Sequence, residues 1–433
     1  MLRLGGWLVG FFFLLMLVVP TTLQEERGGL LALLLIGSIL ILTNSPSRWS
    51  ISAPLVYWLL VCLIYSIFSI IWGVLNDAQG AIAVSTVYVI WPILYIYYIG
   101  FDKTIGRYVV LVKILLVGIF LAAMSGVLFV ASGFYPAVGV LDSYFELLGG
   151  SLGLYENSIE YALSNMTTVI YGLSFMIGFV MLGLRTSIHF SRKWRIFCVG
   201  GLLVSFFVML VSGRKAFMLV GLISVPLSLI LMRMSGIANF QLKSIVKIFG
   251  VASVIIMVGV LIGSMAFGLD LSALFEYFLS GFDFGDPDNV SAARRVEQFN
   301  ALIGEWKSSP FIGFGHGSNA QSAPGDVMPW AYELQYIALL FQTGILGMLV
   351  YGSAVTWLMY QMVRLSRKYA DLAVLMFPAL VGLVCFLMAN ATNPYLSKFD
   401  YLWTIFLPVG LVNIGLLRDN AIRCAGKRFF VHA

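Results

Sequence analysis

Residues 372–390, LAVLMFPALVGLVCFLMAN, form an apolar run without a charged side chain. An α-helix needs about 20 such residues to cross the hydrocarbon core of a bilayer. Eleven similar apolar runs are spread over the 433 residues of the chain, at 4–23, 28–43, 54–75, 80–99, 107–132, 162–184, 195–212, 214–235, 244–268, 331–363 and 401–417. The sequence therefore predicts an all-α polytopic membrane protein, with about twelve transmembrane helices in a single domain over residues 1–433.

The composition supports this class and excludes others. Hydrophobic residues make up 60% of the chain, charged residues make up 11%, and the mean hydropathy is +0.96. Soluble domains carry about 25% charged residues. A soluble enzyme, a nucleic-acid-binding protein and a disordered chain are therefore excluded, and the lipid bilayer is the expected partner. The four scattered cysteines predict neither a disulfide framework nor a metal cluster.

The positive charges divide unequally between the two sides of the membrane. When alternate loops are assigned to one side, 18 Lys and Arg residues fall there and seven fall on the other side, with Lys113 inside a span. Basic loops face the cytoplasm, so both termini and the basic tail 418–433 are expected there. The acidic residues divide the opposite way, three against 17. The formal net charge of +6 therefore reflects topology rather than an acidic ligand.

The two longest loops, at about 133–161 and 269–330, are expected on the outer face, the second with short helices. The cytoplasmic loops are short and contain no phosphate-binding motif. Any chemistry is therefore expected outside, without ATP. The central turns of the spans carry almost no charge, which counts against an ion-coupled transporter but leaves a carrier of lipid-linked substrates open.

Arg214 and Lys215 are two of the seven outer cations, and they lie in a very short hairpin, VSGRKAF at 211–217. One interpretation is a pair of interfacial side chains that extend toward water. The other is an anion clamp at headgroup depth, because a guanidinium binds phosphate oxygens with two parallel hydrogen bonds. A lipid diphosphate would present its charge at that depth.

Arg294 and Arg295 lie in SAARRVEQF at 291–299, within the otherwise acidic outer loop. Apolar residues follow at helical spacing and predict a short amphipathic helix: Val296, Phe299, Leu302 or Ile303, and Trp306. The two arginines either pair with nearby acidic residues (Asp283, Asp286, Asp288 or Glu297) or bind a ligand. A calcium site at the acidic turn 283–288 does not match the spacing of an EF-hand loop, and no metal site is assigned.

Alternating glycines occur in the stretch WKSSPFIGFGHG at 306–317, without the strand and helix of a dinucleotide fingerprint. Backbone flexibility near a ligand fits this pattern. His316 could act as a base or contact a sugar, although a lone loop histidine more often does neither.

The apolar stretch 331–363 is too long for one membrane crossing. Its 33 residues would span roughly 50 Å as a helix, against a core of about 30 Å. We expect it to protrude outward or to break near Gly344 and Gly347. Glu333, at its outer end, either complements a helix N-terminus or serves as a partly desolvated base.

These stretches together resemble the O-antigen polymerase and O-antigen ligase superfamily of bacterial envelope glycosyltransferases. The resemblance rests on the Ser212-Gly213-Arg214 hairpin, the arginine-led helix running into SPFIGFGHG at 309–317, and Tyr332-Glu333 followed by TGILG at 343–347. Their order and spacing over residues 205–350 carry the match, and the N-terminal half adds only hydrophobicity.

The resemblance implies a GT-C type membrane glycosyltransferase that needs no metal or other cofactor. Its substrate would be a glycan on undecaprenyl diphosphate, presented at the periplasmic face of the bacterial inner membrane. A flippase and a chain-length regulator would be partners in lipopolysaccharide or other polysaccharide biosynthesis. Ligases of the family carry a histidine ten residues before the Thr-Gly pair, where this chain has Glu333, so the resemblance favours the polymerase branch.

The expected mechanism follows from these assignments. Arg214 would hold the diphosphate with Lys215, assisted by Arg294 and Arg295, because a metal-free site needs cations for the leaving group. Glu333 would accept the proton of the acceptor hydroxyl. Sugar contacts are expected from His316 and from aromatic residues of the outer loops, namely Tyr144, Tyr155, Trp306, Trp330 and Tyr332.

Three other functions remain open from the sequence. An O-antigen ligase would transfer the glycan to lipid A-core instead of to a lipid-linked unit. A lipid-linked oligosaccharide flippase or a secondary transporter would also have about twelve spans and cytoplasmic termini. A non-catalytic assembly partner would bind polysaccharide without extending it.

Overall fold

The computed structural model describes residues 2–44, 49–101, 103–133, 136–155, 158–212, 214–237, 290–323, 325 and 328–431, with a few isolated positions between 250 and 265. Within these residues, eight helical segments are long and apolar enough to cross a membrane: Ala53–Leu75, Ala81–Ile99, Ile105–Ser132, Arg192–Val211, Lys215–Met234, Gln335–Lys368, Ala370–Ala389 and Phe399–Ile422. Each corresponds to one of the predicted apolar runs. The chain is therefore a largely helical, membrane-embedded protein.

Four predicted spans are not among these eight. Helices α1 (Leu2–Val18) and α8 (Met166–Met181) are apolar but shorter. Helix α2 (Gln24–Asn44) has Glu25, Glu26 and Arg27 in its first turn and includes side chains outside the described residues. The predicted span 244–268 lies outside the described residues, apart from isolated positions. The run predicted at 162–184 is shortened because a strand occupies Ala162 and Gly183, with left-handed backbone (φ 54°), follows the helix end.

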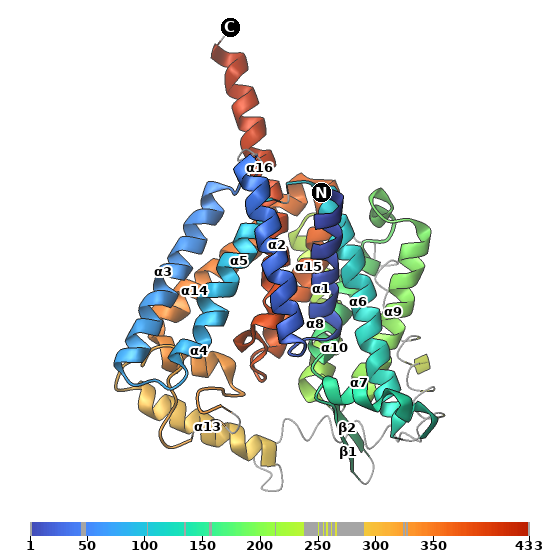
Figure 1. Cartoon of the computed structure of the whole chain (residues 1–433). Helices are drawn as coiled ribbons and strands as arrows, with labels where there is room; N and C mark the ends of the chain where they lie inside the picture. The colour runs from blue at the N-terminus through green and yellow to red at the C-terminus, as the bar shows by residue number, and fades with distance from the viewer. Residues whose placement is uncertain are drawn as a thin grey trace. The chain divides into compact units, whose positions relative to one another are not determined.

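The chain divides into two compact units, the first formed by residues 1–46, 106–283 and 366–389. In this unit α8 packs against α9 (Arg192–Val211), α10 (Lys215–Met234) and α15 (Ala370–Ala389) (Figure 1). The uncharged run 372–390 belongs to α15, and every residue from Leu372 to Leu383 is buried. A helix that is apolar on all sides is stable only when it is enclosed, so this run forms the centre of the unit's core.

The segment predicted as a long loop at about 133–161 contains short helices and a β-hairpin in the first unit. After α6 (Ile105–Ser132), a 3-10 turn (Pro136–Leu141) and α7 (Asp142–Leu147) lead into a β-hairpin of β1 (Ser151–Tyr155) and β2 (Ser158–Ala162). The strands are antiparallel, with Leu152 opposite Tyr161. Tyr161 is buried beside Gly126 of α6, where a side chain would collide with the phenol. The hairpin is therefore fixed by packing that helical periodicity does not reveal.

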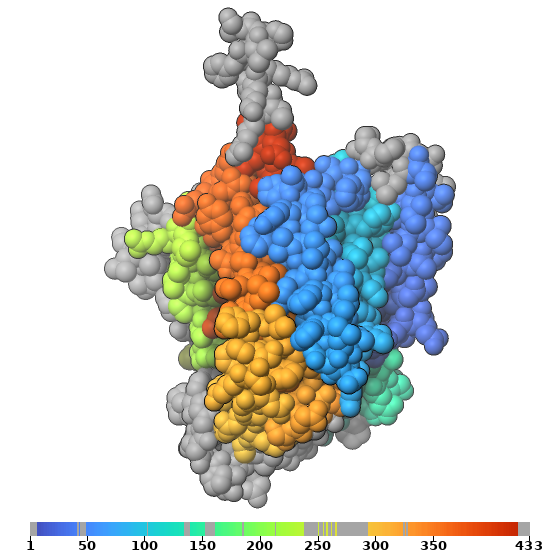
Figure 2. All heavy atoms as spheres, turned by 90° about the vertical axis from the view of Figure 1, so that its left-hand side faces the viewer, coloured from blue at the N-terminus to red at the C-terminus, as the bar shows by residue number. Residues whose placement is uncertain are grey.

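The second unit comprises residues 47–105, 284–365 and 390–433. Its membrane helices are α3 (Ala53–Leu75), the α4–α5 segment (Ala81–Ile99), most of α14 (Gln335–Lys368) and α16 (Trp403–Val431). The short helix α13 (Val290–Trp306) and the loop after it cover one end of α3 and α14 (Figure 2). Asn413 of α16 accepts a hydrogen bond from the Ser52 N–H at 2.9 Å and donates one to the Ser50 carbonyl at 3.3 Å.

The α4–α5 segment contains a wider helical turn. Helix α4 (Ala81–Ser85) passes into a π-helix at Thr86–Ile90, which continues as α5 (Trp91–Ile99). Pro92 lies in the first turn of α5 and has no N–H to donate back into the preceding turn. The irregularity places Tyr88 against the loop that follows α13, where its ring stacks on His316 with centroids 3.9 Å apart.

The break predicted in the stretch 331–363 is confirmed at Gly344, whose φ of 62° and ψ of −171° interrupt α14. The preceding loop supplies backbone partners on both sides of the break. Ile345 and Leu346 donate to the carbonyls of Pro310 and Phe311, at 2.9 and 3.0 Å. Gly315 in turn donates to the Gln342 carbonyl at 2.7 Å. Segment 310–315 therefore runs along α14 at the break and is joined to it by backbone hydrogen bonds.

We predict that Gly315→Ala destabilises the protein by about 2 kcal/mol or more, because two effects add. Gly315 has a φ of 95°, and a Cβ there would collide with the backbone of Gly73. Thermal unfolding of the purified protein in detergent, followed by tryptophan fluorescence, measures the loss. Gly304→Ala is the matched control, because no atom lies within 4 Å of a Cβ added at this position in α13. Equal unfolding temperatures for the two variants would contradict the prediction.

Candidate functional site

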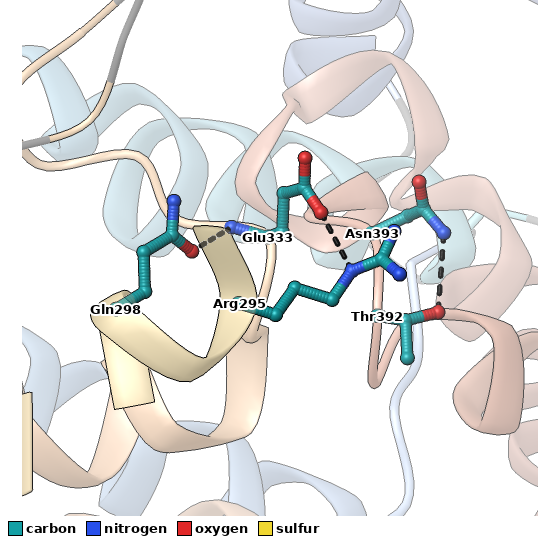
Figure 3. Close-up of polar contacts among 5 residues, drawn as sticks. All are labelled: Arg295, Gln298, Glu333, Thr392 and Asn393. Atoms are coloured by element: carbon teal, nitrogen blue, oxygen red, sulfur yellow. Dashed lines mark hydrogen bonds and ion pairs between the residues drawn. The ribbon is translucent and has the colours of Figure 1, made fainter. Parts of the chain in front are cut away.

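Arg295 of α13 and Glu333, in the segment before α14, form an ion pair in the second unit (Figure 3). Arg295 Nε donates to Glu333 Oε2 at 2.7 Å, and the two side chains are 30% and 40% exposed. A partly exposed pair contributes little to stability. The pair matters because it brings together two candidate site residues. The sequence indicated each of them separately but did not predict that they contact one another.

A buried amide fixes the position of Glu333. Gln298 accepts a hydrogen bond from the Glu333 N–H at 3.2 Å, and its side chain is buried. Gln298 lies one turn after Arg295, so both side chains leave the same face of α13. Leu302, the next residue on that face, is fully buried. Helix α13 therefore presents a mixed polar and apolar face to the segment that carries Glu333.

The buried face of α13 differs from the one that the apolar spacing suggested. Val296 and Phe299 are 43% and 44% exposed, whereas Gln298 and Leu302 are buried. The helix itself, its bounds and its leading arginines agree with the prediction. Hydrophobic spacing did not predict the burial of Gln298. A glutamine is buried only when its amide has a hydrogen-bond partner, and that partner, the Glu333 N–H, is supplied by a distant segment.

The pair has unused hydrogen-bonding capacity. Among the described residues, no partner hydrogen-bonds the two Nη groups of Arg295 or Oε1 of Glu333, since the ion pair joins only Nε to Oε2. Two adjacent guanidinium N–H groups match the oxygens of a phosphate. A free carboxylate oxygen can accept a proton or a hydroxyl hydrogen bond. The pair can therefore bind an anion on one side and an alcohol on the other.

Arg294 has a different environment from its neighbour. Its Nη1 donates to Glu297 Oε2 at 2.7 Å, one turn along the same helix, and Glu297 is exposed. This is the ion pairing that the sequence left open. Asp283, Asp286 and Asp288, the other acidic residues considered as partners, lie outside the described residues.

His316 is buried between three helices. Its backbone N–H donates to Ser69 of α3, its Nε2 shares a hydrogen bond of 2.8 Å with the Tyr351 hydroxyl of α14, and its ring stacks on Tyr88. Burial lowers the pKa of His316 to about 3, and the nearby Gln342 amide opposes this only in part. The ring is therefore neutral near pH 7, and it anchors the loop rather than facing a ligand.

The aromatic residues proposed as sugar contacts also serve the packing of this loop. Tyr332 is buried, and its hydroxyl accepts a hydrogen bond from the Ala320 N–H at 2.7 Å. Trp306 is half-buried and donates to the Pro310 carbonyl at 3.2 Å. The Trp330 ring packs directly against Gly80. In the first unit, Tyr144 hydrogen-bonds Ser125 at 2.9 Å, while the side chain of Tyr155 is outside the described part of the chain.

Arg214 and Lys215 belong to the first unit, at the start of α10. The Arg214 N–H donates to Ser212 Oγ at 3.2 Å, and its side chain is half-buried. Burial raises the pKa of Tyr161, and the positive charge of Arg214 offsets part of that rise. Arg214 is therefore a cation beside the buried phenol of strand β2. Lys215 is the first residue of α10.

The sequence reasoning missed a polar loop between α15 and α16. Figure 3 draws Thr392 and Asn393 with the ion pair, and the Arg295 side chain extends toward them. Asn390 is buried and accepts a hydrogen bond from the Leu396 N–H at 2.9 Å. The signal in the sequence was the polar run NATN, at 390–393, between two apolar spans.

We predict a pH dependence of stability that depends on His316. The pKa of His316 is lower in the folded protein than the ordinary value of 6.5, so the unfolded chain binds more protons below pH 6.5. Stability should fall as the pH drops from 6.5 toward 3, by up to about 1.4 kcal/mol per pH unit. Unfolding temperatures between pH 7.5 and 5 measure this loss. His316→Gln should flatten the profile, whereas His189→Gln should retain it, and equal profiles for all three proteins would contradict the prediction.

Comparison with known proteins adds no family to this geometry. No protein-family model and no curated protein matches the chain. The chemistry of the site residues and the resemblance of their motifs to the O-antigen polymerase and ligase superfamily are therefore what indicate a function.

Proposed function

We propose that the protein is a polysaccharide polymerase of the bacterial inner membrane. It would transfer a growing glycan from undecaprenyl diphosphate to a lipid-linked repeat unit on the periplasmic face, in the synthesis of O-antigen or a related envelope polysaccharide. The observation that carries the proposal is the Arg295–Glu333 pair, which combines a phosphate-binding cation with a carboxylate that can act as a base. A GT-C type fold with about twelve spans and cytoplasmic termini forms part of the proposal.

The proposed reaction is a single displacement at the anomeric carbon of the donor sugar. Glu333 accepts the proton from a hydroxyl of the acceptor sugar, and the hydroxyl oxygen forms the new bond to the anomeric carbon. The bond from that carbon to the diphosphate oxygen breaks, and its electron pair leaves with undecaprenyl diphosphate. No redox partner or nucleotide is needed, because the donor already carries its leaving group.

Electrostatics explain why the two residues are useful as a pair. Arg295 Nε holds Oε2 of Glu333 at 2.7 Å, which leaves Oε1 to accept the proton of the acceptor hydroxyl. The free Nη groups of Arg295 are available to the diphosphate, whose negative charge grows as the glycosidic bond breaks. When Glu333 becomes neutral, the guanidinium loses one anionic neighbour at the moment when the other becomes more negative. Proton transfer and departure of the leaving group therefore support each other.

Arg214 and Lys215 retain the role that the resemblance implies, as binding residues for the diphosphate. In the same proposal, Arg294 is as half-buried as Arg295, but its Nη1 is paired with Glu297 of the same helix. This distinction between adjacent arginines makes the assignment testable with a matched pair of variants.

Glu333 favours a polymerase over a ligase, because it occupies the position where ligases of the family carry a histidine. An O-antigen ligase that attaches the glycan to lipid A-core is the second candidate. A flippase or transporter is disfavoured by the small number of charges within the spans.

We predict that Glu333→Gln and Arg295→Ala abolish long-chain polysaccharide in cells that depend on this protein. Loss of a general base typically costs 10²–10⁴-fold in rate, and loss of a cation that stabilises the leaving group costs about 10²–10³-fold. A gel of envelope polysaccharide should show single repeat units on the core lipid. Arg294→Ala is the matched control and should retain long chains. Unchanged ladders in both site variants, with normal membrane insertion, would contradict the mechanism.

The same gel separates polymerase from ligase. A ligase defect would leave no repeat units on the core lipid and would accumulate lipid-linked polymer. Chain growth by purified protein in detergent, with lipid-linked units and no membrane gradient, would exclude a carrier. An assembly partner would bind the polysaccharide but not extend it.

A further inference from the structure

The loop between α15 and α16 is firmly attached to the second unit. It runs from Asn390 to Leu402 and contains two 3-10 turns, η5 (Tyr395–Ser397) and η6 (Phe399–Tyr401). The Asn390 side chain accepts the Leu396 N–H at 2.9 Å, and the Phe399 ring stacks on Trp91 with centroids 4.9 Å apart and an angle of 4° between the rings. A loop held at both ends in this way presents its remaining side chains in defined positions.

The same loop is connected to the segment that carries Glu333. The Asn390 side chain hydrogen-bonds the Tyr336 hydroxyl, three residues after Glu333. In Figure 3 the Arg295 side chain extends from α13 past Glu333 toward Thr392 and Asn393. Three segments that are distant in sequence therefore place an ion pair, a hydroxyl and an amide in one region of the second unit.

Thr392 and Asn393 have hydrogen-bonding groups to offer. Asn393 Nδ2 donates to Thr392 Oγ1 at 3.2 Å, which orients both side chains, and both are half-buried. The second Nδ2 proton and the Oδ1 of Asn393 have no hydrogen-bond partner among the described residues. An amide offers a donor and an acceptor at once, and a sugar hydroxyl needs both. Neither residue carries a charge that would perturb the nearby ion pair.

We propose that Thr392 and Asn393 form a subsite for the acceptor sugar, binding the hydroxyl groups that flank the hydroxyl facing Glu333. This proposal depends on the proposed function, because it assigns the alcohol side of the Arg295–Glu333 pair. Arg295 binds the leaving diphosphate, Glu333 takes the proton, and the amide and hydroxyl of the loop orient the sugar ring. Asn393 is thus a specificity-determining residue that acts on acceptor binding.

The first experiment measures chain growth by the purified full-length protein in lipid nanodiscs. The donor is preformed polymer on undecaprenyl diphosphate at a fixed concentration, and the acceptor is a fluorescent lipid-linked repeat unit at varied concentration. Loss of one neutral hydrogen bond should raise the acceptor KM roughly two- to tenfold. Asn393→Ala and Thr392→Val should show this rise, with kcat and the donor KM within twofold of wild type.

Asn300→Ala is the matched control, because this exposed amide lies on α13 about 140° around the helix from Arg295. It should leave all three kinetic constants unchanged. A raised donor KM with an unchanged acceptor KM in Asn393→Ala would overturn the subsite. Values for Asn393→Ala that equal those of the Asn300→Ala control would also overturn it.

A second readout does not require turnover. Thermal shifts are measured with bare undecaprenyl diphosphate and with the lipid-linked repeat unit, and the difference between the two reports sugar contacts. Asn393→Ala should reduce this difference and leave the shift by the bare lipid intact, whereas Arg295→Ala should reduce the shift by the bare lipid. If the wild type shows no chain growth but this pattern holds, the polymerase fails and the sugar subsite stands. If chain growth occurs and the difference is unaffected by Asn393→Ala, the subsite fails and the polymerase stands.

Discussion

A bilayer cannot hydrogen-bond the backbone, and this constraint organises the second unit around the break in α14. The left-handed backbone of Gly344 frees N–H and C=O groups that lipid could not satisfy. The loop segment 310–315 satisfies several of them, and the Tyr65 hydroxyl donates to the Thr343 carbonyl at 2.6 Å. That loop also holds His316 against α3 and α14. Helix α13 then packs through Gln298 on Glu333 and through Leu302 on a buried cluster with Ala320, Tyr332 and Phe341.

Hydropathy and length were sufficient for the coarse architecture. The break in α14 was predictable because 33 apolar residues exceed one membrane crossing, and α13 was predictable from its spacing. The Arg295–Glu333 contact could not be predicted. The two residues are 38 positions apart, and the sequence does not show which of several acidic residues comes to lie against α13. The burial of His316 and Tyr332 was missed for a related reason, since both residues are polar enough for solvent and only tertiary packing encloses them. The β1–β2 hairpin was missed because each strand has only five residues and the second ends inside the apolar run predicted at 162–184, although both strands alternate between apolar and small or polar residues.

The described part of the site shows how a protein with few charges separates structural from functional polar groups. Gln298 Oε1, His316 Nε2 and the Tyr332 hydroxyl each hydrogen-bond a backbone group or a buried side chain, so they position the loop. The guanidinium of Arg295 and the carboxylate of Glu333 keep one side of each group unspent. This division provides a physical basis for choosing between two adjacent arginines that the sequence treats alike.

The break in α14 also has an electrostatic consequence. A helix that starts inside a membrane directs the positive end of its dipole and its first N–H groups at whatever lies in front, and broken helices in transporters use such ends to bind anionic substrates. In α14 the N–H groups of Ile345 and Leu346 are already occupied by the carbonyls of Pro310 and Phe311. The loop therefore caps this helix end and cancels part of its field. An anion that approaches the second unit would be drawn to the side-chain charge of Arg295 rather than to the interior of the broken helix.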